Sequence, residues 1–271
     1  MKVLSIDIET YSSADLARTG VYKYTEAEDF CILLFGYSVD DAPVLVVDLA
    51  CGEQIPDHVV AALTDPAVIK TAFNAQFERV CLSRYLGMPT GTYLPPEQWR
   101  CTMVHAKYAG LPGSLKDVGV ALNLTEQKMD EGAALIRYFS KPDKNGQRKL
   151  PQDAYDKWET YKRYNIRDVE VEMSIKKRLE KLPVPDSVWE EYHIDQHIND
   201  RGVMLDITLA ENAIRFAEKA QSELQAELKA LTGLENPNSV QQMLGWLHSH
   251  GVKLDSLGKK EVQQYAATAD G

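Results

Sequence analysis

The stretch LSIDIET, residues 4–10, decides the fold that the sequence predicts. Its residues alternate as those of a β-strand do, because side chains along a strand point to opposite sides in turn. One face carries three aliphatic side chains, whereas the other carries Asp7 and Glu9 side by side. Two neighbouring carboxylates of this kind fit either an edge strand that faces solvent or a binding site for a divalent cation.

The composition indicates an ordinary soluble, globular protein. Of the 271 residues, 44% are hydrophobic and 26% are charged, which is typical of a chain with a sizeable core. No apolar run approaches the ~18 residues that a membrane span needs, and no N-terminal segment resembles a signal peptide. The four cysteines lie far apart without a CxxC pair, which favours reduced thiols. We therefore expect a cytoplasmic protein without a membrane partner.

A net charge of −10 argues against a protein that coats nucleic acid by charge alone, because the phosphate backbone is itself negative. It leaves open an enzyme that acts on the end of a nucleic acid. The site of such an enzyme needs acidic side chains as metal ligands, and the bound metal supplies the local positive charge.

Residues 1–182 predict an α/β domain in which strands come mostly first and helices later. This order favours a mixed sheet flanked by helices. After the opening strand, apolar patterns and turn residues predict strands at 29–41, 42–50 and 68–73, and helices at 55–63, 75–86 and 154–182, with shorter helical pieces at 101–140.

A composition break at PVPDS, residues 183–187, predicts the domain boundary. The segment 183–271 is almost purely helical in its pattern, so we expect a smaller all-helical region there. Before the last helix of the first domain, residues 141–151 predict a polar loop. Its cations would suit contacts to DNA phosphates, although a solvated loop is the default. These cations are Lys141, Lys144, Arg148 and Lys149.

Two further acids join Asp7 and Glu9 as candidate metal ligands. Glu78 lies one turn into the helix after the fourth predicted strand, and Asp168 lies on the long helix with Tyr164 one turn before it. A spacing of four residues places Tyr164 and Asp168 on the same helix face. Carboxylates from three segments can therefore converge on one point, which favours a metal site over a solvent-facing pair.

Ligation by oxygen alone selects hard cations such as Mg²⁺ or Mn²⁺. Two such ions about 4 Å apart form the clamp used for in-line hydrolysis of phosphodiesters. One ion lowers the pKa of the attacking water, and the other stabilises the leaving 3′ oxygen. A tyrosine with a pKa near ~10 is a poor general base at neutral pH, so we expect Tyr164 to position the water.

The set DIE (7–9), NAQFE (74–78) and YNIRD (164–168) resembles the three motifs of the DnaQ-like 3′–5′ exonucleases of the DEDDy type. The resemblance implies an RNase H-like fold, with a mixed five-stranded sheet flanked by helices. It also implies hydrolysis of the proofreading type, in which deoxynucleoside monophosphates leave a single-stranded or frayed DNA 3′ end.

The same resemblance implies roles for individual residues. Asp7 would bridge both metal ions, Glu9 and Asp168 would complete the ion on the side of the nucleophile, and Glu9 would also touch the terminal 3′ hydroxyl. The side chains expected to touch the strand terminus are Thr10, Asn74 and Phe77. Phe77 fits a core position equally well, and Asn74 also fits a helix cap.

Glu78 departs from the family pattern, which has Asp at this position. The extra methylene lengthens the side chain by about 1.5 Å. A ligand that reaches the second ion through water absorbs this shift by re-angling, whereas a direct ligand would bind the ion differently or weaken it. The resemblance therefore implies an active enzyme, and the departure predicts slower turnover.

The remaining segments resemble the family A DNA polymerases, in particular the phage-type members. RCTMVHAKYAGLPGSLKDVGVALNL (100–124) is similar to their exonuclease domain, and residues 190–265, with GLENPNSVQQMLGWL, are similar to the beginning of their thumb. No stretch of the sequence supplies palm carboxylates or a fingers helix with nucleotide-binding cations. The resemblance thus implies the proofreading part of a phage or prophage polymerase, with the palm and fingers region missing, so this chain is not expected to polymerise by itself.

Two alternative functions stay open. An exoribonuclease of the RNase D kind shares the tyrosine of the third motif, and a comparison of DNA with RNA substrates separates it. A metal-poor module that only guides DNA is the other, with Glu78 as a sign of decay. His193 and His197, four residues apart on a predicted helix, have a spacing that fits zinc, but a solvated helix face is favoured because no third ligand is near.

Overall fold

The computed structural model describes residues 1–125, 129 and 131–268. Its first part contains a five-stranded sheet in the order β3-β2-β1-β4-β5. β2 pairs antiparallel with β1 and β3, whereas β4 pairs parallel with β1 and β5. The strands are β1 (Val3–Tyr11), β2 (Cys31–Val39), β3 (Leu45–Asp48), β4 (Ile69–Ala72) and β5 (Trp99–Cys101). The mixed sheet of the predicted RNase H-like class is confirmed.

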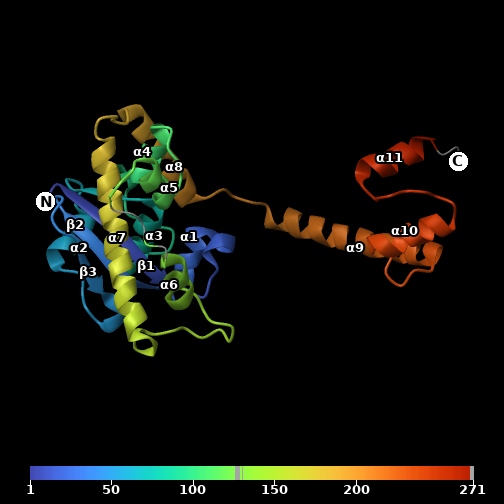
Figure 1. Ribbon diagram of the computed structural model, residues 1–271, viewed down its shortest axis with the longest axis horizontal. Helices are drawn as coiled ribbons and strands as arrows, with labels where there is room; N and C mark the ends of the chain where they lie inside the picture. The colour runs from blue at the N-terminus through green and yellow to red at the C-terminus, as the bar shows by residue number, and fades with distance from the viewer. Residues whose placement is uncertain (126–128, 130, 269–271) are drawn as a thin grey trace. The chain divides into compact units, whose positions relative to one another are not determined.

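Helices cover both faces of this sheet, and α7 runs across one of them (Figure 1). The helices of this part are α1 (Leu16–Glu26), α2 (Asp57–Thr64), α3 (Gln76–Tyr85), α4 (Thr102–Tyr108), α5 (Leu115–Ala121), α6 (Gly132–Phe139), α7 (Tyr155–Leu179) and α8 (Asp186–Arg201). Short 3₁₀ turns at Leu49–Cys51, Pro96–Gln98 and Pro151–Asp153 connect some of these elements. The long helix that the sequence predicts before the composition break is α7.

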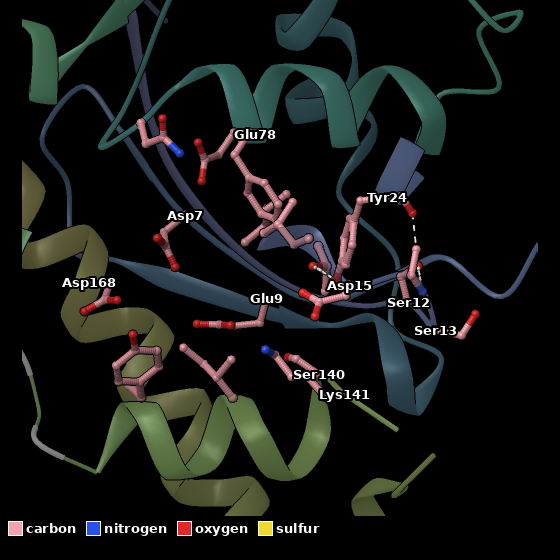
Figure 2. A pocket seen from close by; sticks show the side chains of 18 of the residues that line it. Asp7, Glu9, Ser12, Ser13, Asp15, Tyr24, Glu78, Ser140, Lys141 and Asp168 are labelled. Atoms are coloured by element: carbon pink, nitrogen blue, oxygen red, sulfur yellow. Dashed lines mark hydrogen bonds between the residues drawn. The ribbon is translucent and has the colours of Figure 1, made fainter. Parts of the chain in front are cut away.

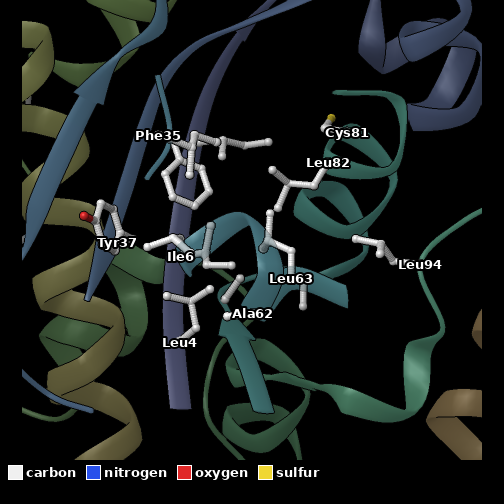
Figure 3. Close-up of a cluster of buried hydrophobic side chains, with 14 of the residues drawn as sticks. Leu4, Ile6, Phe35, Tyr37, Ala62, Leu63, Cys81, Leu82 and Leu94 are labelled. Carbon is white, nitrogen blue, oxygen red and sulfur yellow. The ribbon is translucent and has the colours of Figure 1, made fainter. Parts of the chain in front are cut away.

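One face of the sheet packs on α2 and α3 through an apolar core (Figure 3). Leu4 and Ile6 of β1 and Phe35 of β2 are buried there, together with Leu63 and Leu82 of the two helices. Burying one Leu, Ile or Phe side chain contributes about 1.5–3 kcal/mol. This face therefore supplies hydrophobic stabilisation to the domain.

The opposite face of β1 lies under α7, and its side chains are polar. Ser5 and Glu9 are buried and Asp7 is half-buried, although strand alternation places all three on the face away from the apolar core. The pairing with β2 shifts by a bulge between Glu9 and Thr10. Because α7 carries Asp168 across this face, the sheet and the helix bring acids from distant parts of the sequence together.

The chain divides into two compact units after Val203. α8 therefore belongs to the first unit, whereas the sequence predicts a boundary after residue 182. A buried ion pair holds it there: the guanidinium of Arg79 on α3, itself fully buried, donates to both carboxylate oxygens of Asp200 at 2.6 and 2.8 Å. Leaving one partner of such a pair alone in the interior is costly. The proline-rich segment is thus a turn between α7 and α8.

The second unit is helical, as predicted. α9 (Ile207–Thr232) begins at a cap in which the Asp206 carboxylate accepts from the Leu209 amide at 2.9 Å, and it ends at Gly233 with a φ of +67°. α10 (Val240–Ser249) begins with Ser239 as its cap. α11 (Lys259–Thr268) follows. Side chains that accept the first amides of a helix favour a defined start, so two of these helices carry their boundaries in their own sequence.

Candidate metal centre and its pocket

Three of the predicted metal ligands meet near the C-terminal end of β1. Asp7, Glu9 and Asp168 each offer a carboxylate oxygen, and these atoms all lie within 4.8 Å of one another. Glu9 is 8% exposed and Asp168 is 3% exposed. Figure 2 shows the two acids of the strand and the acid of the helix on the wall of one pocket. Because buried like charges at this separation repel, the arrangement has the charge and the donor set that suit a divalent cation.

Hydrogen bonds from α7 orient the two acids of β1. The Asn165 amide donates to Asp7 Oδ2 at 2.7 Å and to the Asp7 carbonyl at 3.1 Å. The Tyr161 hydroxyl donates to Glu9 Oε2 at 2.5 Å. Gly36 of β2, which pairs with Asp7, permits this approach, because a Cβ there would lie 2.5 Å from Asn165 Oδ1. α7 therefore fixes both carboxylates through its own side chains.

Tyr164 is buried beside the acids, and its ring stacks on that of Tyr161 at a centroid distance of 6.0 Å. Burial, and then the charges of Glu9 and Asp168, raise the pKa of its hydroxyl. The phenol therefore keeps its proton and suits a hydrogen-bond donor better than a base. Gly132 of α6 lies so close that a Cβ there would be 2.1 Å from the Tyr164 ring, so a larger residue would displace this side chain.

Glu78 of α3 lines the same pocket but does not belong to the close group of acids (Figure 2). Its side chain is 4% exposed, and its Oε2 has no hydrogen-bond partner among the residues that the structure describes. Burial raises the pKa of this carboxyl well above its usual value, and the nearby charge of Glu9 adds a smaller increase. A buried carboxylate oxygen without a partner fits the requirement of a cation, and the role of Glu78 as a ligand stays a prediction.

A pocket of about 520 Å³ opens over the acids. Its walls come from β1 and the segment after it, from α1, from the start of α3, from the end of α6 and from α7. They include Thr10, Asn74 and Phe77. Phe77 packs on the apolar core while it lines the pocket, so the two interpretations of this residue are compatible. The Thr10 hydroxyl lies 2.8 Å from that of Tyr24. Contact of these side chains with a strand terminus stays a prediction.

Asn74 does not cap α3 through its side chain, contrary to that interpretation of the sequence. Its φ is +75°, and the cap position is held by Ala75 without a side-chain hydrogen bond. Asn tolerates this left-handed conformation better than most residues. Its backbone carbonyl, rather than its side chain, accepts the Phe77 amide at 2.9 Å. The exposed side chain of Asn74 lines the pocket instead.

A second polar cluster lies on the same face of the sheet, one helical turn beyond the metal centre. Glu172 of α7 is fully buried and accepts a hydrogen bond from Thr102. Lys176 donates to Ser5 of β1 at 3.0 Å, and Ser5 lies 3.0 Å from Thr71 of β4. Burial raises the pKa of Glu172, while Lys176 and the hydroxyls oppose that shift. This cluster ties α7 to the strands and so holds the two acid-bearing elements in register.

The pair His193 and His197 makes structural contacts. A ring nitrogen of His197 lies 2.6 Å from Glu97, and one of His193 lies 3.2 Å from Arg100. Within residues 1–125, 129 and 131–268, the one group of three or more His, Cys, Asp or Glu side chains close enough to hold an ion is that of β1 and α7. The structure therefore favours the non-metal interpretation of these histidines.

Sequence reasoning missed four residues that shape the centre: Gly36, Gly132, Tyr161 and Asn165. Tyr161 lies three residues before Tyr164 and Asn165 lies three residues before Asp168, and a spacing of three places each pair on neighbouring parts of one helix face. That signal was available. The glycines carry no comparable signal, because the need for them arises from contacts with α7 that the sequence does not display.

The comparison with curated proteins agrees with the predicted resemblance, although no protein-family model matches the chain. The chain is 51% identical over 270 residues to the DNA polymerase of Bacillus phage SP02, which covers 97% of this chain and 41% of that polymerase. The resemblance to a phage DNA polymerase is confirmed. The chain spans less than half the length of this relative, so the likeness concerns that part of the polymerase alone.

Solved structures of nucleases are more distant. Escherichia coli RNase D, an exoribonuclease involved in structured RNA processing, is 14% identical with a TM-score of 0.44, covering 75% of this chain and 46% of that one. Brucella melitensis NrnC with bound Mg²⁺ is 14% identical with a TM-score of 0.42, covering 74% of this chain and 82% of that one. Likenesses this weak leave the function to be argued from the site itself.

The structure also bears on the cysteines and on membrane-spanning helices. All four cysteines are free thiols, and two of them, Cys81 and Cys101, are buried. Among the described residues no helix has both the length and the apolar character to cross a membrane. The cytoplasmic location stays a prediction.

Proposed function

We propose that this chain is a metal-dependent 3′–5′ exonuclease of the proofreading type, acting on single-stranded or frayed DNA ends. The observation that carries the proposal is the convergence of Asp7, Glu9 and Asp168, whose ligand oxygens lie within 4.8 Å of one another inside a pocket. Two buried acids and one half-buried acid have no structural use for such proximity, since each would be more stable apart from the others.

The residues at this centre fit two Mg²⁺ or Mn²⁺ ions. Asp7, Glu9 and Asp168 would hold these ions, and Glu78 would serve as a further ligand. Bound there, the ions would supply an activated water and would neutralise the charge that develops on the phosphate. The donor set is made of oxygens only, as hard cations require, and the partnerless Oε2 of Glu78 belongs to the same pocket.

The other residues of the centre would orient the reacting groups. Tyr161 and Asn165 hold the carboxylates of Glu9 and Asp7 by hydrogen bonds of 2.5 and 2.7 Å, so little rearrangement is needed when substrate arrives. Tyr164 keeps its phenolic proton and would donate it in a hydrogen bond to the attacking water. The walls of the pocket would receive the last nucleotide, with Phe77 against its base.

Glu78 is the position at which this proposal departs from the family pattern. Asp would be the shorter ligand, and Glu in its place should slow turnover. Glu78→Asp is therefore expected to raise the rate a few-fold at saturating Mg²⁺, whereas Glu78→Gln, which removes the charge, should lower it. Equal rates and equal metal dependence in all three proteins would mean that this side chain takes no part in metal binding.

The relative favours DNA as substrate, because the protein that the chain resembles at 51% identity is a DNA polymerase. The acids and Tyr164 would serve an exoribonuclease of the RNase D kind equally well. A hydroxyl at the 2′ position is what distinguishes the two nucleic acids at such a site. Matched DNA and RNA single strands of one sequence decide between these candidates.

The experiment that tests the proposal follows a 5′-labelled single strand during a titration with Mg²⁺ or Mn²⁺. We expect stepwise shortening from the 3′ end with release of deoxynucleoside monophosphates, no reaction in EDTA, and a slower reaction on RNA. Asp7→Ala, checked for folding by its thermal transition, is the control. A folded wild-type protein that binds the strand but never shortens it would support the guiding module instead.

A further inference from the structure

The four basic residues of the loop after α6 differ in what their side chains contact. Lys149 forms an ion pair within the loop at 3.1 Å, and the guanidinium of Arg148 lies 4.9 Å from the centre of the Tyr11 ring. Lys144 is exposed and is not among the described residues that line the pocket over the acids. Lys141 does line that pocket, so it differs from the other three in where its charge is available.

Lys141 is fixed at the pocket by its neighbours in the sequence. Ser140 is buried at the end of α6, and its hydroxyl lies 2.7 Å from that of Tyr161, which donates to Glu9 at 2.5 Å. Pro142 follows and restricts the backbone on the other side. The backbone that carries the exposed Lys141 side chain is therefore tied to the metal centre through two hydrogen bonds.

Lys141 is the one cation among the described residues that line this pocket, where the other charged side chains are all acids: Asp7, Glu9, Asp15, Glu78 and Asp168. Neither a hydrogen bond nor an ion pair ties its ammonium to another described residue. A lysine ammonium with three donors and no partner is available to an anion, and the anion that a nuclease pocket meets is a phosphate.

A strand in this pocket carries a phosphate at every internucleotide link, and the acidic walls repel each of them. The scissile phosphate would be neutralised by ions held on the three acids. The next phosphate towards the 5′ end lies farther from them and needs a cation of its own. Figure 2 shows Lys141 on the side of Glu9 away from Asp168.

We infer that Lys141 binds the phosphate immediately 5′ of the scissile one, so that the site prefers strands with at least two phosphodiester links. The inference rests on the proposed function and names a contact within its substrate site. The contact acts on the ground state and the transition state alike, because this phosphate does not react. Its loss should therefore raise KM and leave kcat nearly unchanged.

The test compares Lys141→Ala with Lys144→Ala, a change in the same loop that removes the same charge away from the pocket. The substrates are a thymidine trinucleotide and a thymidine dinucleotide without terminal phosphates, which hold two links and one link. We expect Lys141→Ala to raise KM for the trinucleotide about tenfold and to leave KM for the dinucleotide unchanged. Lys144→Ala should match the wild type on both, and Lys141→Arg should recover most of the loss.

Three kinetic results would overturn the inference. An unchanged KM for the trinucleotide in Lys141→Ala would show that Lys141 does not bind this phosphate. An equal rise in KM for both substrates would place Lys141 on the scissile phosphate instead. A fall in kcat without a change in KM would likewise contradict a role in ground-state binding.

A binding measurement separates this inference from the proposed function. Fluorescence anisotropy of labelled oligo(dT), with Ca²⁺ in place of Mg²⁺, gives the dependence of affinity on salt. One phosphate contact fewer should lower the slope of log K against log salt by about 0.7 in Lys141→Ala, with no change in Lys144→Ala. If the wild-type protein binds the oligonucleotide but never hydrolyses it, a lowered slope in Lys141→Ala would still support the phosphate contact, and only the exonuclease proposal would fail. An unchanged slope overturns the contact.

Discussion

Both faces of β1 are covered by helices, but they differ completely in chemistry. One face sends Leu4 and Ile6 into the apolar core with α2 and α3, and both side chains are at most 1% exposed. The other face sends Asp7 and Glu9 under α7, where Asn165 and Tyr161 bind them. A single nine-residue strand thus separates the part that stabilises the domain from the part that we propose reacts.

This difference explains how the domain stays folded although it buries neighbouring carboxylates. Burial of apolar groups is favourable at each position, whereas burial of neighbouring carboxylates is unfavourable until a cation joins them. The polar face therefore depends on the apolar face for its geometry. Substitutions on the two faces should therefore separate stability from activity.

The largest effect is expected at the centre of the polar face. Asp7→Asn keeps the shape of the side chain and removes one of the three charges that would hold the ions. Because metal binding supplies several kcal/mol of transition-state stabilisation, hydrolysis of a single-stranded oligonucleotide should fall by about 10³-fold or more. The thermal transition of the metal-free protein should stay or rise, since one of three mutually repelling charges is gone. A large loss of stability would show instead that Asp7 is a structural residue.

The apolar face should respond in the opposite way. Ile6→Ala opens a cavity in the core and is expected to lower the free energy of unfolding by about 2–5 kcal/mol, and Ile6→Val by about 0.5–1.5 kcal/mol. Denaturant unfolding measures both. Below the transition, the rate per folded molecule should equal that of the wild type. If activity falls in proportion to the lost stability while the protein remains folded, the two faces are not separable.

Tyr161→Phe should give an intermediate effect, because it removes the donor to Glu9 and the contact with the Ser140 hydroxyl but leaves every carboxylate in place. Residues that orient metal ligands typically alter metal affinity or activity by about 10–100-fold, so we expect a rise of that order in the Mn²⁺ concentration needed for half-maximal rate. Tyr37→Phe, which removes a hydroxyl from a tyrosine of the apolar core cluster, is the matched control. If both variants show the same Mn²⁺ dependence, Tyr161 does not orient Glu9 for metal binding.

The smallest effect concerns the cluster beyond the centre and appears in the pH dependence of stability. The pKa of Glu172 is raised in the folded protein, so its protonated form stabilises the fold fully below the usual value near 4.5. That contribution is lost as the pH rises through the raised pKa. Wild-type stability should therefore fall with rising pH relative to Glu172→Gln, with a slope of at most ~1.4 kcal/mol per pH unit for one proton. Parallel curves for the two proteins would contradict this assignment.

Local patterns predicted most of the fold and the candidate metal ligands, but not the residues that support those ligands. Alternation identified β1 and its two carboxylates, and a spacing of four placed Tyr164 with Asp168. The compact units divide after Val203 rather than after residue 182. This difference could not be predicted, because the pair of Arg79 and Asp200 joins residues 121 positions apart and no local pattern encodes such a contact. The same holds for Gly132, where a glycine is needed because the ring of Tyr164 lies directly against it.

The central claim is that Asp7, Glu9 and Asp168 together hold catalytic cations. Calorimetric titration of the metal-free protein with Mn²⁺ tests it most directly, because it counts the ions without requiring a substrate. We predict two ions per wild-type chain and weaker or absent binding in Asp7→Asn and Asp168→Asn, each folded by its thermal transition. Folded wild-type protein that takes up no Mn²⁺, or that binds it equally well after both acids are neutralised, would contradict the claim.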